Sequence, residues 1–596
     1  MKKIIVSQVL LAALTLCART YYISPDAQTG GDGSKEKPFA KIQQGLDNAK
    51  PGDTVELAPG IYYERVKFVR SGDYLKPIRL NGPRTAIIDG TVEFTQNWKK
   101  APQYGPKAWC AKVPDIFFPN TVRNPGSGLV IDPDGLIIQL FEKRVKDINN
   151  SQNDKRTTWY APELMSKGIG RTGFNFIKAL AMYRPKTRDV IVAYGDGRDV
   201  SKANLKFTPP IPSVTISGVN RCVVSGITIR HAWMGVFIEN SLGSTVEDCR
   251  IMRSDRGVEL ASGSDRCIVR FCDISMDPIF RCNPSLKGGW DAAWPGHKRG
   301  GYWDRIGINI RQSIGGHQIH DNYIHNHWGG IQDYGDPEQN LLLNVHHNRI
   351  DEIEDDGLEP NGSGKYCLWH HNYVTRSRCG FRIKCINQGP IFAFGNVFFN
   401  NHEDFRNFVG SNYPKTFFLA YHNTSITRAA INNNKVKMPP GSPNYCFFNN
   451  IFVCDAIYGG THAVNWRDAG NVYIRRTDTP QWDNSIANAK KHGFKSTSRF
   501  LKDAKPEIAD AANGNFEISA ASPARNAGVD LKKYNLPGVD EFYGSTNDCG
   551  AVPYGSKMFK TARRPTEVSH VAAGAWPKPE DKLVLPSGIG TGLITR

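Results

Sequence analysis

The chain has 596 residues, of which 40% are hydrophobic and 57 are glycine, so its composition excludes an intrinsically disordered protein. Its formal charge of +18 favours acidic partners, but it contains no nucleic-acid-binding motif. The spacings of the 13 cysteines match neither a small disulfide scaffold nor a zinc site, and no apolar run after the N-terminal segment could span a bilayer. We therefore expect a monomer whose partner is an acidic glycan, with no nucleic acid and no membrane span.

The first predicted element is a signal peptide at residues 1–18. Two lysines form a basic start, an apolar run follows over residues 4–16, and the small residues Cys17 and Ala18 come next. This pattern is typical of secretion signals and predicts a secreted or periplasmic protein. Lipoprotein anchoring fits less well, because Leu16 is not the small residue expected before Cys17.

Residues 19–96 are predicted to hold an N-terminal cap and the first coils of a solenoid. The segment YYISPDAQTGGDGSKEKPFAKIQQGLDNAKPGDTVELAPGIYYE (Tyr21–Glu64) resembles the start of secreted right-handed parallel β-helix proteins that act on carbohydrates, and residues 518–555 resemble their closing segment. The resemblance implies a short helix around Ile42–Ala49 that covers the first coil, where an open solenoid end would expose core and unpaired strand edges. The group includes polysaccharide lyases, glycoside hydrolases and epimerases, so it implies the pectin-lyase-like fold without deciding the reaction.

The remaining chain divides by pattern. Residues 97–210 interrupt the coils and are predicted to form an inserted β-rich lobe. Residues 211–470 hold short, alternating, β-branched segments that recur every 22–26 residues without a helical period, as a parallel β-helix requires. Residues 471–555 are predicted to form the C-terminal coils and closing segment, and residues 556–596 a tail. The predicted fold class is therefore all-β: a right-handed parallel β-helix with an N-terminal capping helix and an inserted lobe.

Two columns of residues define the repeat. The first column contains Asn322, Asn348, Asn372 and Asn396, which are separated by 26, 24 and 24 residues. Ile227 and Cys249 occupy the same position in two earlier repeats. Asparagines stacked at a turn can bond one another and the backbone of the next coil. Cys249 and Cys272 are accordingly predicted to be small buried stacking residues rather than a disulfide. The second column is glycine: Gly235, Gly257, Gly330, Gly357 and Gly380.

A long segment rich in tryptophan and glycine, residues 279–310, lies between two coils. Loops of this length inside compact domains are usually functional or disordered. Trp290, Trp294 and Trp303 are candidates for stacking on sugar rings, and the alternative is that they anchor the loop to the solenoid.

The glycine column predicts which side chains face outward, because strand residues alternate between faces. The apolar residues directly after the glycines are placed inside: Val236, Val258, Ile331, Leu358 and Phe381. The next position points outward and holds Phe237, Glu259, Gln332, Glu359 and Arg382. Two residues further along stand Glu239, Ala261, Tyr334, Asn361 and Lys384. Since adjacent coils lie about 4.8 Å apart, one outward patch is predicted to contain Gln332, Tyr334, Glu359, Asn361, Arg382 and Lys384.

This patch suits glycoside hydrolysis, which needs one protonated and one ionised carboxyl group. Asp355, Asp356 and Glu359 are the catalytic candidates, because crowded carboxylates raise the pKa of one of their number. Arg382 and Lys384 would hold a substrate carboxylate or sulfate. The Arg-Ile-Lys triplet and the aspartate pair resemble elements of the polygalacturonase family, whose Asn-Thr-Asp and Gly-His-Gly elements do not occur here. The hydrolase hypothesis requires no cofactor.

Elimination at a uronate is the alternative reaction. Lys384 or Arg382 would remove the proton at C5, while cations neutralise the uronate carboxylate. A lyase could use Ca²⁺ held by acidic residues of this region: Asp351, Asp355, Asp356 or Glu359. A non-catalytic glycan-binding β-helix is the third hypothesis.

Several polar residues near the patch have two interpretations. Glu259 and His327 are further candidates for substrate binding, and His327 is the histidine closest to the outward strand. The other histidines recur at turns, which favours a structural role: His325, His346, His347, His370 and His371. Asp355 also fits an ordinary turn before Gly357, and Asp333 falls at an inward position.

Overall fold

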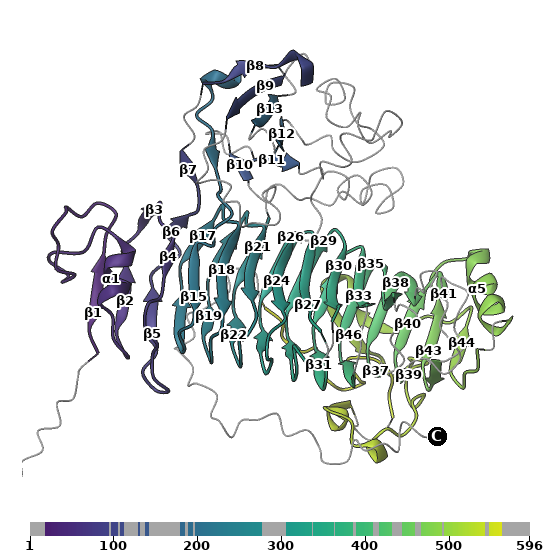
Figure 1. The fold of residues 1–596 in the computed structure, drawn as a ribbon. Coiled ribbons are helices and arrows are strands. Elements are labelled where there is room, and N and C mark those ends of the chain that lie inside the picture. The colour runs from purple at the N-terminus through teal and green to yellow at the C-terminus, as the bar shows by residue number, and fades with distance from the viewer. Residues whose placement is uncertain are drawn as a thin grey trace, which may run out of the picture.

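The computed structural model describes residues 18–562 apart from internal gaps (Figure 1). The gaps are residues 94–96, 105–107, 113–128, 132–136, 142–178, 185–188, 195–196, 277–304, 337, 363, 385–388, 409–416, 432–443, 459–465, 492–493 and 543–546. The predicted signal peptide, except for residue 18, and most of the predicted tail lie outside the described residues. Within residues 18–562, outside these gaps, no helix is long and apolar enough to cross a membrane.

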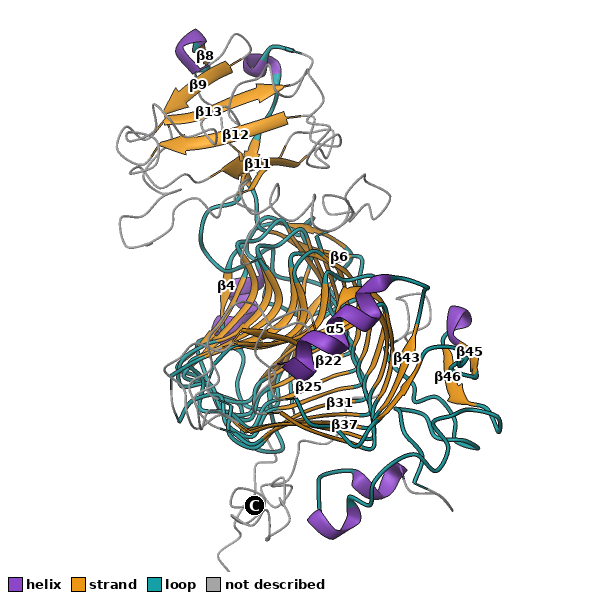
Figure 2. Cartoon of the chain, turned by 90° about the vertical axis from the view of Figure 1, so that its right-hand side faces the viewer, coloured by secondary structure: helices purple, strands orange, loops and turns teal. Residues whose placement is uncertain are grey.

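The chain winds into a parallel β-helix whose coils stack along one axis (Figures 1 and 2). Among the described residues, its first sheet has thirteen strands, all paired in parallel. They are β1 (Thr20–Ile23), β2 (Thr54–Leu57), β5 (Ile78–Asn81), β16 (Cys222–Ser225), β19 (Thr245–Glu247), β22 (Ile268–Arg270), β25 (Gln318–His320), β28 (Asn344–His346), β31 (Cys367–His370), β34 (Ile391–Phe394), β37 (Phe417–Tyr421), β39 (Asn444–Phe448) and β42 (Trp466–Ala469).

A second sheet, with 23 strands in the part of the chain that the structure describes, forms the other walls in two rows. The first row follows the asparagine turns: β3 (Gly60–Tyr62), β6 (Ala86–Asp89), β17 (Thr228–Arg230), β20 (Arg250–Met252), β23 (Asp273–Ser275), β26 (Tyr323–His327), β29 (Arg349–Ile353), β32 (Tyr373–Thr375), β35 (Val397–Glu403), β38 (Thr424–Ile431), β40 (Ile451–Cys454), β43 (Val472–Arg475) and β44 (Arg499–Leu501). The second row comes after one further bend: β4 (Val66–Lys67), β15 (Val214–Ser217), β18 (Met234–Glu239), β21 (Arg256–Leu260), β24 (Ile306–Arg311), β27 (Gly329–Tyr334), β30 (Asp356–Pro360), β33 (Cys379–Lys384), β36 (Arg406–Phe408) and β41 (Ala456–Tyr458). The predicted parallel β-helix is thus confirmed.

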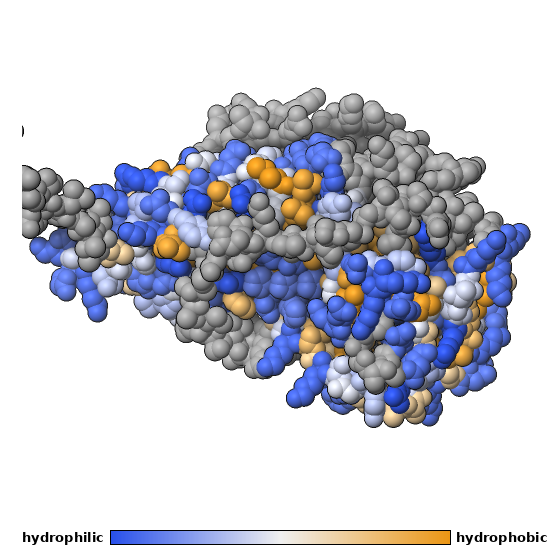
Figure 3. Space-filling view, turned by 90° about the horizontal axis from the view of Figure 1, so that it is seen from below, coloured by the Kyte–Doolittle hydropathy of each residue, from blue (hydrophilic) through white to orange (hydrophobic). Residues whose placement is uncertain are grey.

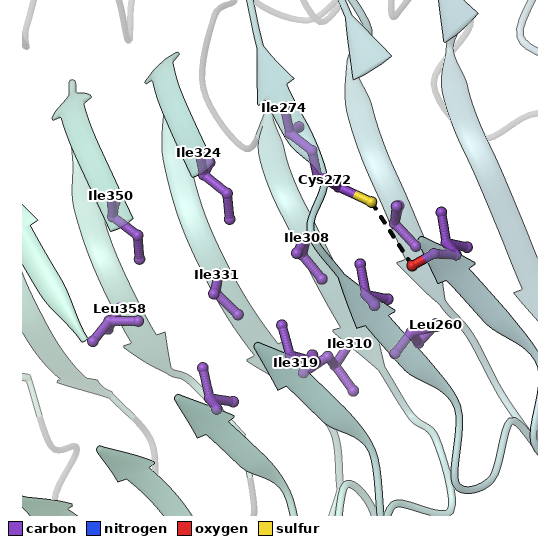
Figure 4. Packing of buried hydrophobic residues seen from close by; sticks show 14 of the residues in the cluster. Leu260, Cys272, Ile274, Ile308, Ile310, Ile319, Ile324, Ile331, Ile350 and Leu358 are labelled. Atoms are coloured by element: carbon purple, nitrogen blue, oxygen red, sulfur yellow. Dashed lines mark hydrogen bonds between the residues drawn. The ribbon is translucent and has the colours of Figure 1, made fainter. Parts of the chain in front are cut away.

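The core is a column of aliphatic side chains inside the coils (Figure 4). In the first row Ile274 pairs with Ile324, and Ile324 pairs with Ile350. In the second row Ile331 pairs with Leu358, and both are fully buried. Because in-register parallel strands lie about 4.8 Å apart, each coil packs its apolar residues against apolar residues at the same position of the next coil.

The asparagine column is a continuous hydrogen-bonded ladder. The Asn348 backbone N–H and side-chain amide both donate to Oδ1 of Asn372, at 3.1 and 3.0 Å, and the pattern repeats from coil to coil. The ladder extends beyond the four predicted asparagines to three more, Asn423, Asn450 and Asn471. Upstream, Cys272 N–H donates to Asn322, and Cys249 and Cys272 are buried free thiols. This confirms the stacking role predicted for these two cysteines.

The glycine column marks a place where a side chain does not fit. A Cβ on Gly257 would lie 2.5 Å from the carbonyl oxygen of Gly307 in the next coil, and a Cβ on Gly330 would lie 2.2 Å from that of Gly357. Gly307, within the residue 279–310 segment, is a member that the sequence pattern did not reveal. Each of these glycines is the second residue of a second-row strand, so it follows the bend between the two rows directly.

The chain between β6 and β15 forms a separate lobe with an eight-stranded sheet (Figures 1 and 2). All its pairings are antiparallel except that of β11 with β12. Its strands are β7 (Val92–Glu93), β8 (Lys99–Lys100), β9 (Ala108–Lys112), β10 (Leu129–Ile131), β11 (Ile137–Phe141), β12 (Ala179–Arg184), β13 (Asp189–Tyr194) and β14 (Lys206–Phe207), with short 3-10 turns at Pro102–Tyr104 and Val200–Lys202. A small core of its own includes Val190, Val192 and Phe207.

Helices cover both ends of the solenoid (Figure 1). The predicted cap is α1 (Ile42–Asn48), which buries Ile42 and Leu46 in the core. At the opposite end α5 (Pro480–Lys491) inserts Trp482, which is 1% exposed, into the same core. Each helix replaces the neighbour that a terminal coil lacks.

After α5 the chain returns along the outside of the coils. It includes β45 (Ile508–Asp510), β46 (Asn515–Ile518) and 3-10 turns at Ala511–Asn513, Lys532–Tyr534 and Val539–Phe542. Leu531 and Phe542 pack on Phe394 and Leu419 of the first sheet. Seen from below, the coloured surface is mainly hydrophilic, with separate hydrophobic areas (Figure 3).

Candidate active site

The second row of the second sheet carries a polar column on its outward face. Glu259 of β21 pairs with Asn309 of β24, Asn309 pairs with Gln332 of β27, and Gln332 pairs with Glu359 of β30. On the next two coils, Arg382 of β33 pairs with Arg406 of β36. The inward neighbours predicted from the glycine column are fully buried: Val236, Val258, Ile331, Leu358 and Phe381. The predicted inside–outside frame is therefore confirmed, and Asn309 and Arg406 extend it.

Side chains that point away from the core are not all exposed to solvent. Glu359 is 7% exposed and Arg382 is 8% exposed, although both point away from the core. Buried charges at such places need partners. The candidate site is therefore a packed ionic network instead of a set of free surface charges.

The network is centred on the two aspartates that precede Gly357. Arg378 Nη1 lies 3.0 Å from Oδ1 of Asp355, and Arg382 Nη1 lies 2.5 Å from Oδ2 of Asp356. Arg382 Nη1 is also 3.7 Å from Oδ2 of Asp355. One coil of chain thus brings the aspartate pair and the arginine of the Arg-Ile-Lys triplet into contact, as the sequence predicted.

The following coil adds two charges that sequence reasoning missed. Glu403 and Arg406 form an ion pair at 3.0 Å, and both are buried. Glu403 pairs in register with Cys379, which itself pairs with Asp356. The segment HEDFRNF contains both residues, but Asp404 stands where the other coils have the column glycine. The repeat is therefore hard to align at this coil. We call Asp355, Asp356, Glu359, Arg378, Arg382, Glu403 and Arg406 the charge cluster.

The two adjacent aspartates have opposite protonation tendencies. Burial, reinforced by the neighbouring Asp356 carboxylate, raises the pKa of Asp355 to about 6. Burial also opposes ionisation of Asp356, but Arg382 and Arg406 outweigh it and hold the pKa of this carboxyl below its usual range. The site therefore offers a carboxylic acid next to a carboxylate, the combination that acid–base chemistry needs.

Arg382 remains a cation in this environment. Burial alone would lower the pKa of its guanidinium, but Asp356, Glu359 and Asp355 raise it above its usual value. Arg382 is consequently suited to hold a negative charge and unsuited to accept a proton. The side chain of Lys384, the other predicted base, lies outside the described residues, although its backbone continues β33 opposite Phe408.

The predicted substrate-binding residues occupy different environments. Tyr334 at the end of β27 is 52% exposed, Gln332 is partly exposed, and Asn361 is buried directly after β30. Glu259 is 2% exposed, pairs with Arg256 and lies 3.4 Å from the Asn309 amide. It therefore belongs to a separate buried ion pair further along the column.

The predicted position of His327 beside the outward face is wrong. His327 pairs in register with the core residue Ile353 and is 1% exposed, because β26 runs on to this residue before the chain bends. Burial lowers the pKa of His327 to about 3, and its Nδ1 lies 3.0 Å from the Arg305 carbonyl oxygen. Trp290, Trp294 and Trp303 lie outside the described residues.

The acidic residues named as possible Ca²⁺ ligands do not form an open set of oxygens. Asp351 pairs with Arg376, and Asp355 and Asp356 pair with Arg378 and Arg382. Among the described residues, no group of three or more acidic, histidine or cysteine side chains is arranged to hold a metal ion. The arrangement therefore does not fit a Ca²⁺ site built from these four acids.

The turn histidines form two aromatic stacks away from the charge cluster. In one, His320, His346 and His370 stack at centroid distances of 4.9 and 5.0 Å, and Phe394 and Tyr421 continue the column. In the other, His347 stacks on His371 at 5.3 Å. Nδ1 atoms 2.8 Å apart link His346 to His347 and His370 to His371. Their contacts support the predicted structural role; His325 instead pairs with Asp273 at 2.9 Å.

No protein family matches the sequence, and no curated protein matches it. Solved structures do match over most of the chain. A complex of XylC with xylose has 15% identity and a TM-score of 0.42, covering 82% of this chain and 87% of that chain. The pectate lyase Pel9A has 14% identity and a TM-score of 0.40, with coverage of 90% and 96%. A family 28 exopolygalacturonase of Yersinia enterocolitica has 11% identity and a TM-score of 0.35, with coverage of 77% and 79%.

Proposed function

We propose that the protein is an exported glycoside hydrolase that degrades an acidic, uronate- or sulfate-bearing polysaccharide at the charge cluster. The observation that carries the proposal is the adjacent pair of Asp355, with a pKa raised to about 6, and Asp356, with a lowered pKa. Glycoside hydrolysis uses one carboxylic acid and one carboxylate.

Asp355 is the proton donor in this proposal. It is the member of the aspartate pair that keeps its proton to higher pH, and its side chain is 13% exposed compared with 1% for Asp356. The second carboxyl group in the reaction is Glu359 instead of Asp356, because Arg382 already pairs with Asp356. Glu359 points outward on β30, four residues beyond Asp355, which gives a Cα separation of up to about 13 Å at about 3.3 Å per residue. Asp356 keeps Arg382 in place between the two acids.

The acidic substrate is inferred from charge. Three arginines of adjacent coils gather at the cluster, and guanidinium groups bind carboxylates and sulfates with two parallel hydrogen bonds. The excess of 18 basic over acidic side chains adds long-range attraction for a polyanion. Tyr334, exposed at the end of β27 one coil away, would stack against a sugar ring. Residues 1–18 support export.

A lyase is the second candidate. Lys384, two residues beyond Arg382 on β33, would be its base, because Arg382 holds its proton. The Ca²⁺ expected for a lyase is tested by adding a chelator, and loss of activity with recovery on Ca²⁺ addition would favour this candidate.

The deciding experiment follows both products of the mature protein on a panel of acidic glycans. New reducing ends without the ultraviolet absorbance of an unsaturated uronate support hydrolysis, whereas both signals together support elimination. The pH profile gives an independent answer, because a hydrolase loses activity as pH rises through about 6 and Asp355 loses its proton. Binding of an acidic glycan with neither product would identify a non-catalytic glycan-binding β-helix.

A further inference from the structure

Asp333 is a carboxyl group inside the solenoid. It belongs to β27, where its register partners are Ile310 of the previous coil and Pro360 of the next. The side chain is 0% exposed, and burial raises its pKa to about 7. A carboxyl at a core position is costly, so what it contacts indicates why it is there.

The Asp333 side chain contacts two backbone N–H groups that directly follow β30. Asn361 N–H and Gly362 N–H both donate to Oδ1 of Asp333, at 2.8 and 2.9 Å. Pro360 has no N–H and cannot donate to the ladder between β27 and β30. Asn361 N–H also donates to the backbone carbonyl oxygen of Asp333 at 3.1 Å, so the Asp333 side chain adds a second acceptor for Asn361 and supplies the acceptor for Gly362 N–H.

The segment held in this way carries residues of the proposed site. Glu359 immediately precedes Pro360, and Asn361 immediately follows it. A Cβ on Gly362 would lie 2.5 Å from the backbone nitrogen of Gly335, so this segment is pressed against the chain just after Tyr334. A change in the direction of the strand end would therefore move residues on both coils.

We propose that Asp333 is a positioning residue, which fixes the end of β30 and thereby the direction of the Glu359 carboxylate. This inference rests on the proposed function of Glu359. Asp333 itself faces the core and touches neither substrate nor the reacting atoms.

The test compares Asp333→Asn with Asp333→Leu. The asparagine keeps the oxygen that accepts both N–H groups. The leucine fills the space, removes the acceptor of Gly362 N–H and leaves Asn361 N–H only the backbone carbonyl oxygen of residue 333, at 3.1 Å in the parent. The matched control is Asp468→Leu, which removes another buried carboxyl that accepts hydrogen bonds from Ser496 and Ser498 at the C-terminal end of the first sheet. All variants are assayed on acidic glycan well below their melting temperatures.

We expect Asp333→Leu to lower kcat by about 10²-fold with a smaller change in KM, since a misplacement of 1 Å can cost that much. Asp333→Asn should restore kcat to within a few-fold of the parent, and Asp468→Leu should lose stability while keeping kcat. Equal kcat for Asp333→Leu and Asp468→Leu would overturn the proposal, as would a fall in kcat for Asp333→Asn as large as that for the leucine variant.

Amide hydrogen exchange separates this proposal from the proposed function, because it needs no substrate. Exchange at residues 357–362 should rise in Asp333→Leu and stay at the parent rate in Asp333→Asn. If the parent protein cleaves no acidic glycan, the proposed function fails, while the exchange result still decides whether Asp333 fixes the strand end. Unchanged exchange in Asp333→Leu would overturn the positioning role whatever the activity.

Discussion

The asparagine ladder and the polar column of the second row pass through the same coils but differ in how the residue type changes from one coil to the next. Along the ladder one residue type repeats, and each asparagine bonds the next through the same two hydrogen bonds. Along the polar column the residue changes at almost every coil, from Glu259 through Asn309 and Gln332 to Glu359. A residue type that repeats from coil to coil marks a position that stabilises the solenoid. A residue type that varies marks a position that can take a catalytic or binding role.

The histidine stacks show how far this distinction reaches. Histidine is a common catalytic residue, and several recur near the charge cluster in sequence. Yet they stack in columns that Phe394 and Tyr421 continue, so aromatic shape is what repeats there. Repetition along the coils therefore outweighs residue type as evidence of role.

The largest effect should come from the charge cluster, which includes Glu359, Arg382 and Arg406 of the varying column. We expect Asp355→Asn to reduce turnover by about 10²–10⁴-fold, because it removes the proton donor. Initial rates from reducing ends measure this. Asp321→Asn, at a turn beside the histidine stack, is the matched control and should keep its turnover. Full activity in Asp355→Asn would break the comparison, because the charge cluster beside the varying column would then lack its proposed proton donor.

The next effect concerns stability at the repeating column. Asn372→Leu removes an Oδ1 that accepts two hydrogen bonds from Asn348 and an amide that donates to Val345 and Asn396. Buried donors and acceptors left unpaired cost about 1–3 kcal/mol each, so the free energy of unfolding should fall by several kcal/mol. Denaturant melts measure the change. Turnover of the variant, assayed while folded, should match the parent; an unchanged unfolding midpoint would contradict the ladder's role.

A smaller effect should appear with pH at the histidine stacks. Burial lowers the pKa of His346 to about 2 and that of His371 to about 3, below the usual value of 6.5. The unfolded chain therefore binds more protons below pH 6.5, and folding stability should fall as pH drops from 6.5 towards 3, by up to about 1.4 kcal/mol per pH unit for each imidazole. Melts across this range measure the slope.

The matched variant for the pH prediction replaces His346 and His370 by phenylalanine, the residue that Phe394 provides in the same stack. Its stability should depend less on pH between 6.5 and 3 than that of the parent. An identical slope in both proteins would show that the stacked histidines do not control acid stability.

The smallest effect is that of salt on substrate binding. Exposed charges are screened over about 10 Å at 0.1 M ionic strength, so affinity for an acidic glycan should weaken several-fold as salt rises from low to physiological levels. Affinity for a neutral glucan is the control and should hardly change. Equal salt dependence for the two glycans would remove the case for an anionic substrate.

Much of the fold was predictable because the residues that define one coil of the β-helix recur in the following coils. Four asparagines and five glycines define the coil length, the turn and the outward face, since each coil packs only on its neighbours. The same repeat is enough to predict that Asp355, Asp356 and Arg382 lie side by side. Trp290, Trp294 and Trp303 stay a prediction, because they lie outside the described residues.

The rest depended on contacts that do not repeat. Glu403 and Arg406 were missed where the register shifts between Phe399 and Asn401 and an aspartate replaces the column glycine. The burial of Glu359 and Arg382 could not be read from alternation, which gives the direction of a side chain but not what covers it. The misplacement of His327 has a different cause, because β26, like β29, has two more residues than β23, and these carry a polar residue into the core.

The lobe joins the solenoid through a narrow attachment. Asp89, the last residue of β6, pairs directly with Arg230 of β17, although 141 residues separate them in sequence. The two ends of the lobe meet the solenoid at neighbouring residues. Gly90 N–H donates to the Arg230 carbonyl oxygen, and the Thr208 hydroxyl donates to the His231 carbonyl oxygen. The coil therefore closes without the lobe, and we expect the chain to tolerate its exchange for another domain. Such a junction is a natural place for recombination, at which a β-helix could acquire a new accessory module without disturbing its winding.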